Sequence, residues 1–517
     1  MIGLLSSGSE AHKYVKSAFI RSFTSSQIKD IEITTSSITG DIGVLVLISP
    51  SEEEMQLAIN SESIQKIIVF GSLPLSLSER FRFTLSDFPS DQWGRSSNAM
   101  TYHYAESKEK IQYTDLAKNY FGDIKDRPLE RFDFMDEWNN LGFGAVGTKN
   151  DIWSVTSPIT FYENVISNIS DNENVVCTYS ALWESKGKSF LWFNREVGPI
   201  DSYEWQLVEK YISSYHCERA ICYPVLLEVP CGYDCAVTMR LDCDEDIESS
   251  RRLWQLYLKE KVPFSLAIHT SNLSDSKHYS LINEVKDSGG AILSHTATHA
   301  PNWGGSYESA LQEAKVSSEL IESVIGESVR YAVSPFHHTP IYALQALSDA
   351  GYLGCIGGII KNDPEFLTYN GGNLPDLPDT FIAHSQQVML HGDCLLTKEL
   401  DPLRIYKESF NLSKQSNTIF GYLDHPFSDR YQYGWDTEEQ RCSMHFQLLH
   451  FIRENTEIPC FFNEIDAMEF LQDKVNIELY LENNTPKMRF KSGYQHISKY
   501  IPKIMFKNEF IEVELCE

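Results

Sequence analysis

Short runs of apolar residues, each followed by a turn or a helix signal, mark the first 230 residues. Such continuous apolar runs are typical of buried parallel strands. The segment EWQLVEKYISSY (Glu204–Tyr215) instead has apolar residues at helical spacing. We therefore predict an α/β accessory domain of the doubly wound kind over residues 1–230, whose role the sequence does not reveal. Its clearest predicted strands are GVLVLI (Gly43–Ile48), KIIVF (Lys66–Phe70) and SFLWF (Ser189–Phe193).

From Ala236 onwards, strand-like runs alternate with helical ones at a regular pace. The strand-like runs are AVTMRLD, VPFSLAI, GAILSH, VRYAVSP and GCIGGII, and the helical ones include SSRRLWQLYLKE, YSLINEVKDSG, the segment 307–324 and IYALQALSDAG. Regular β–α alternation predicts a parallel barrel or sheet. In a β/α barrel the catalytic residues lie at the carboxyl ends of the strands. We assign this domain to residues 231–472.

The pattern changes again near Lys474, where apolar and polar residues begin to alternate. IELYLE, MRFKSG and EFIEVEL have the two-residue period of strands, with turn residues between them. A small β-rich appendage is therefore predicted over residues 473–517. The expected fold class is α/β, with a (β/α) barrel preceded by a doubly wound domain and followed by this appendage.

The charge balance excludes one class of partner. The chain has 72 acidic and 44 basic side chains and a formal net charge of −28. Nucleic-acid binding needs clustered Lys and Arg, so we expect no nucleic-acid partner. No apolar window reaches the ~18 residues that span a bilayer, and the N-terminus lacks the basic and apolar regions of a signal peptide. The eleven cysteines include no C-x-x-C pair, which fits reduced thiols in a cytoplasmic protein.

The first candidate for chemistry is Asp242-Cys243-Asp244, which closes an apolar run. Side chains alternate in an extended segment, so the two carboxylates are expected to point to the same side and Cys243 to the other. Two carboxylates at one strand end can divide the work, one ligating a metal and the other taking a proton from water. A solvated acidic loop, continued by Glu245 and Asp246, is the alternative interpretation.

The second candidate is HTATHAP (His295–Pro301), which follows the strand-like GAILS. Two histidines four residues apart lie on one side of a helical turn and can present two nitrogens to one ion. With a carboxylate from the first motif they would leave coordination positions open for water and substrate. We predict a divalent metal, by default Zn²⁺, with Co²⁺, Ni²⁺ or Fe²⁺ fitting the same ligands.

The third candidate is Asp424-His425-Pro426, after the run IFGYL. A histidine at a late strand end can reach the same edge of the barrel and serve as a general acid. The alternative is a histidine in a surface loop.

Residues 231–472 resemble the polysaccharide deacetylases, the NodB-homology domain of carbohydrate esterase family 4. The first family motif ends a strand with two aspartates, and the resemblance makes Asp242 the catalytic base and Asp244 a metal ligand. HTATH matches the motif H-[ST]-x-x-H, which makes His295 and His299 the other ligands. GYLDH matches the last motif, which makes His425 the general acid.

The third family motif is altered. The family usually has an arginine shortly before a proline, whereas AVSPFHH keeps Pro335 and has Val333 in the place of the arginine. The wall of the substrate groove is therefore expected to differ, with Pro335, His337 and His338 as candidate substrate contacts. The fourth family motif has no assigned counterpart.

The resemblance implies a metal-dependent hydrolase that removes an N-acetyl group from an amino sugar. The expected partner is an N-acetylated sugar, nucleotide sugar or glycan, met in the cytoplasm during bacterial surface-polysaccharide or O-antigen biosynthesis. The sequence leaves the oligomeric state open, including a homo-oligomer. Two alternatives remain, another amide or formamide hydrolase on the same scaffold and a non-catalytic carbohydrate-binding module.

Overall fold

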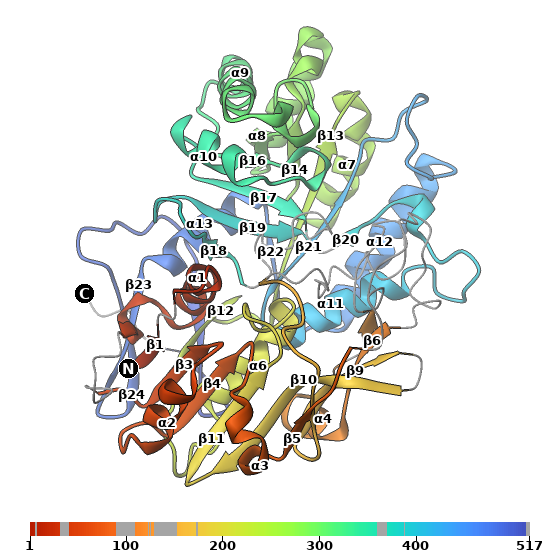
Figure 1. Ribbon diagram of the computed structural model, residues 1–517. Helices are drawn as coiled ribbons and strands as arrows, with labels where there is room; N and C mark the ends of the chain where they lie inside the picture. The colour runs from red at the N-terminus through yellow and green to blue at the C-terminus, as the bar shows by residue number, and fades with distance from the viewer. Residues whose placement is uncertain are drawn as a thin grey trace.

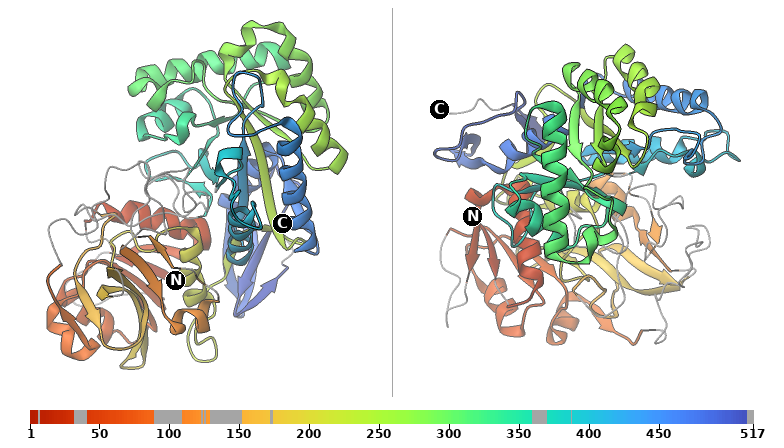
Figure 2. Two further views of the ribbon diagram at one scale, coloured as in Figure 1. Left: turned by 90° about the vertical axis from the view of Figure 1, so that its right-hand side faces the viewer. Right: turned by 90° about the horizontal axis from the view of Figure 1, so that it is seen from above.

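Two large sheets organise the chain (Figures 1 and 2). The structure is a computed structural model, and it describes residues 1–5, 8–31, 41–88, 109–122, 124, 126–128, 152–171, 174–358, 370–386 and 388–512.

The first sheet has nine strands in the order β2-β1-β3-β4-β11-β10-β9-β6-β7. The pairs from β2 to β11 are parallel, and those from β11 to β7 are antiparallel. The three predicted strands are confirmed as β3, β4 and β11. The bounds are β1 Ile2–Leu5, β2 Ile28–Ile31, β3 Val44–Ile48, β4 Lys66–Phe70, β6 Glu109–Tyr113, β7 Arg127–Pro128, β9 Val165–Asp171, β10 Asn174–Ser185 and β11 Lys188–Phe193.

Helices cover both faces of the parallel part of this sheet. Val44 and Val46 of β3 pack in the cluster that contains helices α1 (Ala11–Phe23) and α6 (Ser202–Ser213). Leu45 and Leu47 pack in the opposite cluster with α2 (Glu52–Asn60) and α3 (Ser78–Phe81). Burial on both faces explains the continuous apolar runs. The parallel part is thus arranged as in a doubly wound sheet, whereas the antiparallel part was not predicted. Other elements of this region include α4 Asp115–Phe121 and the paired strands β5 Phe83–Leu85 and β8 Ile159–Phe161.

The second sheet runs in the order β18-β19-β17-β16-β15-β14-β13-β21-β20, with β22 also paired to β13. All of its pairs are parallel except β18 with β19. The β–α alternation predicted after Ala236 is confirmed. The strands are β13 Cys235–Cys243, β14 Ser265–Ile268, β15 Ala291–Ser294, β16 Tyr331–Val333, β17 Gly354–Gly358, β18 Gly372–Asn373, β19 Ile382–Gln386, β20 Val388–Met389, β21 Ile419–Asp424 and β22 Pro459–Phe462.

Seven helices lie between or after these strands in the described part of the chain. They are α7 Arg251–Glu260, α8 Tyr279–Asp287, α9 Tyr307–Ile325, α10 Ile341–Asp349, α11 Arg404–Ser416, α12 Glu438–Glu454 and α13 Glu464–Val475. Residues 359–360 of the predicted strand GCIGGII lie outside the described residues. No pairing joins the end strands β18 and β20 among the described residues, so closure of the barrel stays a prediction.

The C-terminal residues form short strands that return to earlier parts of the chain. β23 (Ile477–Glu482) and β24 (Thr485–Phe490) form a hairpin, and Ser26 Oγ donates a hydrogen bond to the backbone oxygen of Leu479. β25 (Pro502–Phe506) pairs with β12 (Val225–Pro230) on one side and β26 (Glu509–Ile511) on the other. Residues 513–515 of the predicted strand EFIEVEL lie outside the described residues. The domain boundaries at 230 and 472 stay predictions.

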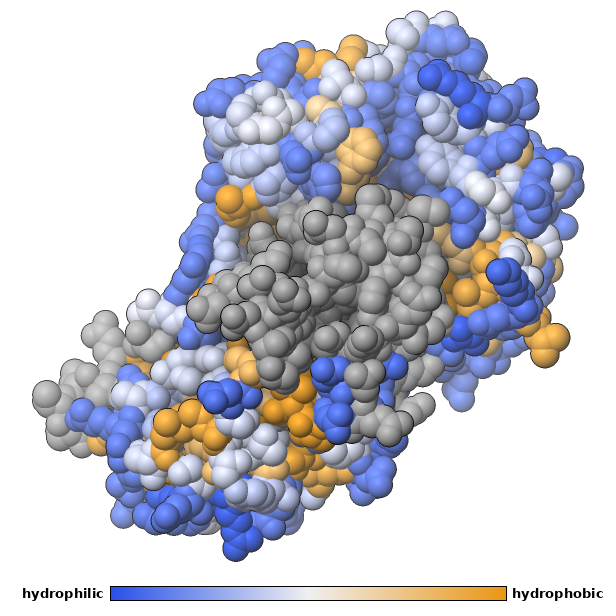
Figure 3. Space-filling view, turned by 45° about the vertical axis from the view of Figure 1, so that its right-hand side comes forward, coloured by the Kyte–Doolittle hydropathy of each residue, from blue (hydrophilic) through white to orange (hydrophobic). Residues whose placement is uncertain are grey.

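In the part of the chain that is described, the helices show no membrane-spanning pattern. None of its helices combines the length and the apolar character that a bilayer crossing requires. Most of the coloured residues in Figure 3 are hydrophilic, and the hydrophobic ones lie in scattered patches.

Candidate active site

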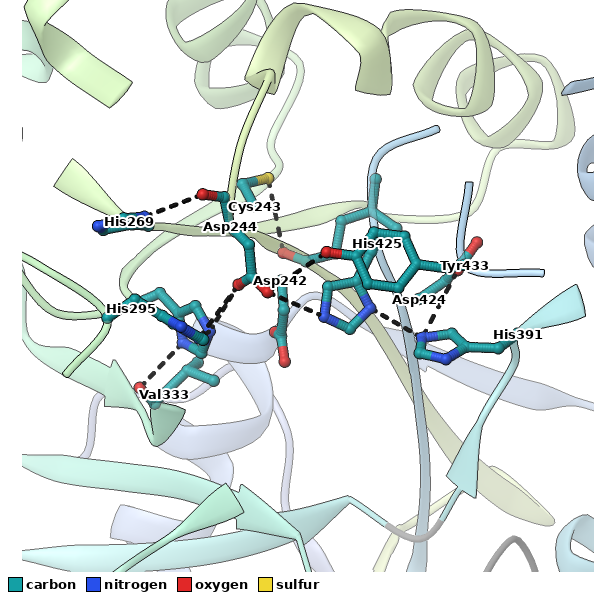
Figure 4. Close-up of polar contacts among 12 residues, drawn as sticks. Asp242, Cys243, Asp244, His269, His295, Val333, His391, Asp424, His425 and Tyr433 are labelled. Atoms are coloured by element: carbon teal, nitrogen blue, oxygen red, sulfur yellow. Dashed lines mark hydrogen bonds and ion pairs between the residues drawn. The ribbon is translucent and has the colours of Figure 1, made fainter. Parts of the chain in front are cut away.

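The predicted site residues lie at one edge of the second sheet. Asp242 is the penultimate residue of β13 and Asp244 follows its end, His295 follows β15, and His425 follows β21. Because these strands are parallel, their carboxyl ends meet at the same edge. Figure 4 shows the side chains of Asp244, His295 and His425 converging there.

Asp244, His295 and His299 form a nearly equilateral triangle of ligand atoms. Asp244 Oδ1 lies 3.2 Å from His295 Nε2 and 3.3 Å from His299 Nε2, and the two nitrogens are 3.1 Å apart. Ligands held about 2.0–2.1 Å from a tetrahedral ion lie roughly 3.3 Å from one another. Asp244 Oδ1 is buried and accepts no hydrogen bond within the described part of the chain. These three residues therefore fit a divalent metal ion.

A backbone carbonyl orients the His295 ring. His295 Nδ1 lies 3.1 Å from the carbonyl oxygen of Val333, which can only accept, so Nδ1 carries the proton. The Nε2 lone pair is then directed toward the other two ligand atoms, as in metal sites whose second ring nitrogen is hydrogen-bonded. Burial, and secondly His295, lower the pKa of His299 to about 4. His299 is therefore neutral near pH 7, the form that binds a metal.

The two histidines do not share a helical turn, and that expectation was wrong. Thr296 and His299 have φ angles of 67° and 53°, so the segment after β15 is an irregular loop. Glu313 of α9 holds it: Oε2 accepts from the backbone N–H groups of Ala297 and Thr298 at 2.8 Å each. Glu313 Oε1 accepts from the Thr298 hydroxyl at 2.6 Å. The four-residue spacing therefore brings the imidazoles together through loop geometry.

Asp242 is paired with an arginine that sequence reasoning missed. Arg240, two residues earlier on the same face of β13, donates from Nε and Nη2 to the two carboxylate oxygens at 2.6 and 3.2 Å. Burial alone would raise the pKa of Asp242, but the positive charge of Arg240 beside it holds that pKa well below its usual range. Asp242 is therefore ionised. The alternation of side chains along a strand was the signal that could have paired Arg240 with Asp242.

His425 directs one ring nitrogen toward the triangle of ligand atoms and the other toward a second histidine. Its Nε2 lies 3.6 Å from Asp244 Oδ2, and its Nδ1 lies 2.8 Å from His391 Nε2. Tyr433 stacks on the His425 ring, with 4.1 Å between centroids, and its hydroxyl donates to Asp244 Oδ2 at 3.4 Å. His391 and Tyr433 belong to no motif, and no sequence pattern pointed to either residue.

Asp424, next to His425, is fully buried and already has its partners. It accepts from Arg441 Nε at 2.6 Å, and His445 Nε2 and Trp435 Nε1 lie 3.0 and 3.3 Å from its oxygens. Burial would raise its pKa, but Arg441 and His445 hold it far below the usual range. His391, Asp424 and His425 are also close together. Their spacing is uneven, with 2.8 Å between the histidine nitrogens and 4.0 Å from His391 to Asp424, so they fit a metal poorly.

The altered third motif lies beside His299. Pro335 is buried, while Phe336 is 48% exposed and its ring centroid lies 4.5 Å from that of His299. Phe336 and His337 have φ angles of 53° and 57°, a region that side-chain-bearing residues rarely adopt. Burial lowers the pKa of His337 to about 3. The Nδ1 atoms of His337 and His338 are buried and make no hydrogen bond within the described residues.

The fold and the site thus define a mixed α/β protein with a cluster of histidines and carboxylates at the edge of a parallel sheet. Residues 244–354 match the family model described as polysaccharide deacetylase. Over these residues the chain is therefore similar to the polysaccharide deacetylases. The match includes Asp244, His295 and His299 and does not extend to Asp242 or His425.

The other comparisons add distant likenesses. A comparison with curated proteins found no match. A protein from Mycobacterium smegmatis assigned as a polysaccharide deacetylase is 14% identical, with 47% of this chain and 92% of that chain covered and a TM-score of 0.37. The Xyl-CE4 domain of a xylanase from the hindgut metagenome of Trinervitermes trinervoides is 14% identical (45% and 89% covered, TM-score 0.30). The PuuE allantoinase is 10% identical (47% and 91% covered, TM-score 0.36).

Proposed function

We propose that this protein is a metal-dependent hydrolase that removes the N-acetyl group from an amino sugar or glycan. The observation that carries the proposal is the triangle of Asp244, His295 and His299, with sides of 3.1–3.3 Å. A divalent ion held by these residues, by default Zn²⁺ and otherwise Co²⁺, Ni²⁺ or Fe²⁺, would act as a Lewis acid toward the acetamide carbonyl and toward water.

The neighbouring residues supply the two proton transfers that amide hydrolysis needs. Asp242 is ionised and held by Arg240, so it can accept the proton of the attacking water. His425 presents Nε2 toward the same centre and can donate a proton to the departing nitrogen. A C–O bond forms, the C–N bond breaks, and acetate and a free amino sugar leave. Each transfer is typically worth ~10²–10⁴ in rate.

The proposed substrate class is supported by the family match over residues 244–354 and by the residues beside the triangle. Phe336 offers an exposed ring next to His299, and Pro335, His337 and His338 belong to the same segment. We propose that this segment contacts an N-acetylated sugar, a nucleotide sugar or a glycan. The proposed setting is bacterial surface-polysaccharide or O-antigen biosynthesis in the cytoplasm. Residues 1–230 are proposed to take no part in the chemistry, since all the assigned groups come from the second sheet.

The decisive experiment measures acetate release from N-acetylhexosamine glycans together with bound metal. We expect the wild type to release acetate and a chelator to abolish the release. Asp242→Asn should keep the metal and lose turnover by ~10²-fold or more, because it removes the base and not a ligand. Asp244→Asn should lose the metal.

Asp246→Asn provides the matched control, because Asp246 lies in the same acidic segment and pairs with Lys277 at 3.4 Å. It should keep both metal and turnover. Bound metal without acetate release would favour a different amide or formamide hydrolase. Absence of both metal and turnover in the wild type would favour a carbohydrate-binding module. If Asp242→Asn lost the metal and Asp244→Asn kept it, the roles of the two aspartates would be exchanged.

A further inference from the structure

We propose that His391 is a positioning residue that holds the ring of His425 with Nε2 directed at the metal-ligating triangle. The inference rests on the proposed function, in which His425 protonates the departing nitrogen. His391 follows β20, and His425 follows β21, the strand with which β20 pairs. The two imidazoles therefore come from neighbouring strand ends, 34 residues apart in the chain.

Three contacts restrain the His425 residue. His391 Nε2 lies 2.8 Å from Nδ1, and the Tyr433 ring stacks on the imidazole at an interplanar angle of 16°. The third contact is at the backbone, where Arg441 Nη2 donates to the carbonyl oxygen of His425 at 2.6 Å. A rotation of the ring by half a turn would turn Nε2 away from Asp244 and would leave a buried nitrogen of His391 without its partner, which is unfavourable.

The hydrogen bond has a preferred direction. Only one of the two facing nitrogens can carry the hydrogen, because each imidazole nitrogen is either a donor or an acceptor. Burial, and secondly the charge of His425, lower the pKa of His391 to about 3, so His391 stays neutral. The Asp393 carboxylate lies 3.9 Å from His391 Nδ1 and favours the proton on that nitrogen. His391 Nε2 is then the acceptor, and His425 Nδ1–H is the donor.

The neighbouring carboxylate does not take over this role. Carboxylates commonly orient histidines in this way, and Asp424 directly precedes His425. However, Arg441, His445 and Trp435 occupy the oxygens of Asp424. Its nearer oxygen lies 4.0 Å from His391 Nε2, beyond hydrogen-bonding distance. Among the described residues, His391 is the hydrogen-bond partner of the His425 Nδ1 atom.

Two variants test separately the hydrogen-bond acceptor and the aromatic ring of His391. His391→Gln keeps a carbonyl acceptor at a similar reach, and His391→Phe keeps a ring of similar size without an acceptor. We expect His391→Phe to lower kcat at least tenfold, toward the ~10²-fold loss expected for His425→Ala. KM, metal content and the melting temperature should stay close to those of the wild type. His391→Gln should restore most of kcat. Unchanged kcat in His391→Phe, or equal losses in the two folded variants, would overturn the proposal.

A second measurement does not depend on turnover. In the full chain labelled with ¹⁵N-histidine, the signal of His425 can be identified by its absence in His425→Gln. We expect a protonated, hydrogen-bonded Nδ1 in the wild type and in His391→Gln, and its loss in His391→Phe. A wild type that shows this signal but releases no acetate would refute the proposed function and keep the pairing. Acetate release with an unprotonated Nδ1 would refute the pairing alone.

Discussion

His269 and His295 are close neighbours of Asp244 with different relations to the triangle. His295 Nδ1 donates to Val333, and its Nε2 faces Asp244 Oδ1. His269 Nδ1 lies 2.9 Å from the backbone carbonyl of Asp244, and its ring centroid is 5.7 Å from that of His299. His269 is not among the residues whose ligand atoms converge with those of Asp244. His295 is therefore one corner of the triangle, whereas His269 lies beside it.

At the residue scale we predict that His295→Ala and His299→Ala each remove the metal while the fold persists. Each substitution deletes one corner of the triangle, and a catalytic ion held by only three protein ligands tolerates little loss. His269→Gln is the control and should keep the metal. Metal content after dialysis and the metal-dependent rise in melting temperature measure the effect. Full metal occupancy in either alanine variant would refute the ligand assignment.

At the scale of elements, α9 carries part of the metal site although it contributes no ligand. The loop after β15 has residues in the left-handed region, so its own backbone cannot hydrogen-bond as a helix would. Glu313, on the second turn of α9, satisfies two of its backbone N–H groups and one hydroxyl. Ser306 begins the helix by accepting from the Ser309 N–H at 3.2 Å, which fixes where Glu313 lies. Helix α9 therefore holds the loop that carries the ligands His295 and His299.

Glu313→Gln should weaken metal binding by about tenfold, in the range typical of residues that support ligands. The substitution removes the charge and replaces one accepting oxygen with a donor, so the N–H groups of Ala297 and Thr298 compete for the remaining one. Glu319→Gln, at an exposed position of the same helix, is the control and should bind metal like the wild type. Titration with metal by calorimetry measures both. Equal affinities would show that the loop is held by other contacts.

At the scale of the whole molecule, buried polar contacts join the two large sheets. Glu209 of α6 accepts from Ser22 of α1 at 2.7 Å and from Asn370 at 2.8 Å. Lys474 of α13 lies 3.8 Å from Glu228 of β12, and both side chains are almost fully buried. One continuous apolar cluster also contains residues of α1, α6 and the second sheet. We therefore expect the two halves to unfold together.

Burial raises the pKa of Glu209 from 4.5 to about 7. The folded state then binds a proton that the unfolded state releases between these values. The contribution of Glu209 to the free energy of unfolding is fully present below pH 4.5. This contribution is lost as the pH rises to about 7, and the loss is at most ~3 kcal/mol. Glu209→Gln should remove this dependence.

The melting temperature of Glu209→Gln, relative to the wild type, should therefore rise from pH 5 to pH 8. Glu53→Gln, at an exposed position of α2, is the control and should show no such trend. Parallel pH curves for Glu209→Gln and the wild type would indicate that Lys474 keeps Glu209 ionised in the fold.

The sequence by itself determined the strands β3, β4 and β11, the β–α alternation of the second sheet, and the residues at the ends of its strands. These features are local: a continuous apolar run records burial on both faces, and a strand end is visible where that run stops. Asp244, His295 and His299 could therefore be named before their distances were known. The antiparallel strands β9 and β10 were missed because their pairing depends on partners and not on a local period.

Only the tertiary structure decided which side chains complete the site. Arg240 is a buried cation in an apolar strand, and it is acceptable there because Asp242 neutralises it. His391 and Tyr433 meet His425 and Asp244 across 34 and 189 residues of chain. Glu313 holds a loop whose left-handed residues no spacing rule predicts. Each of these contacts has its physical cause in the packing of distant segments, which leaves no pattern within a short stretch of sequence.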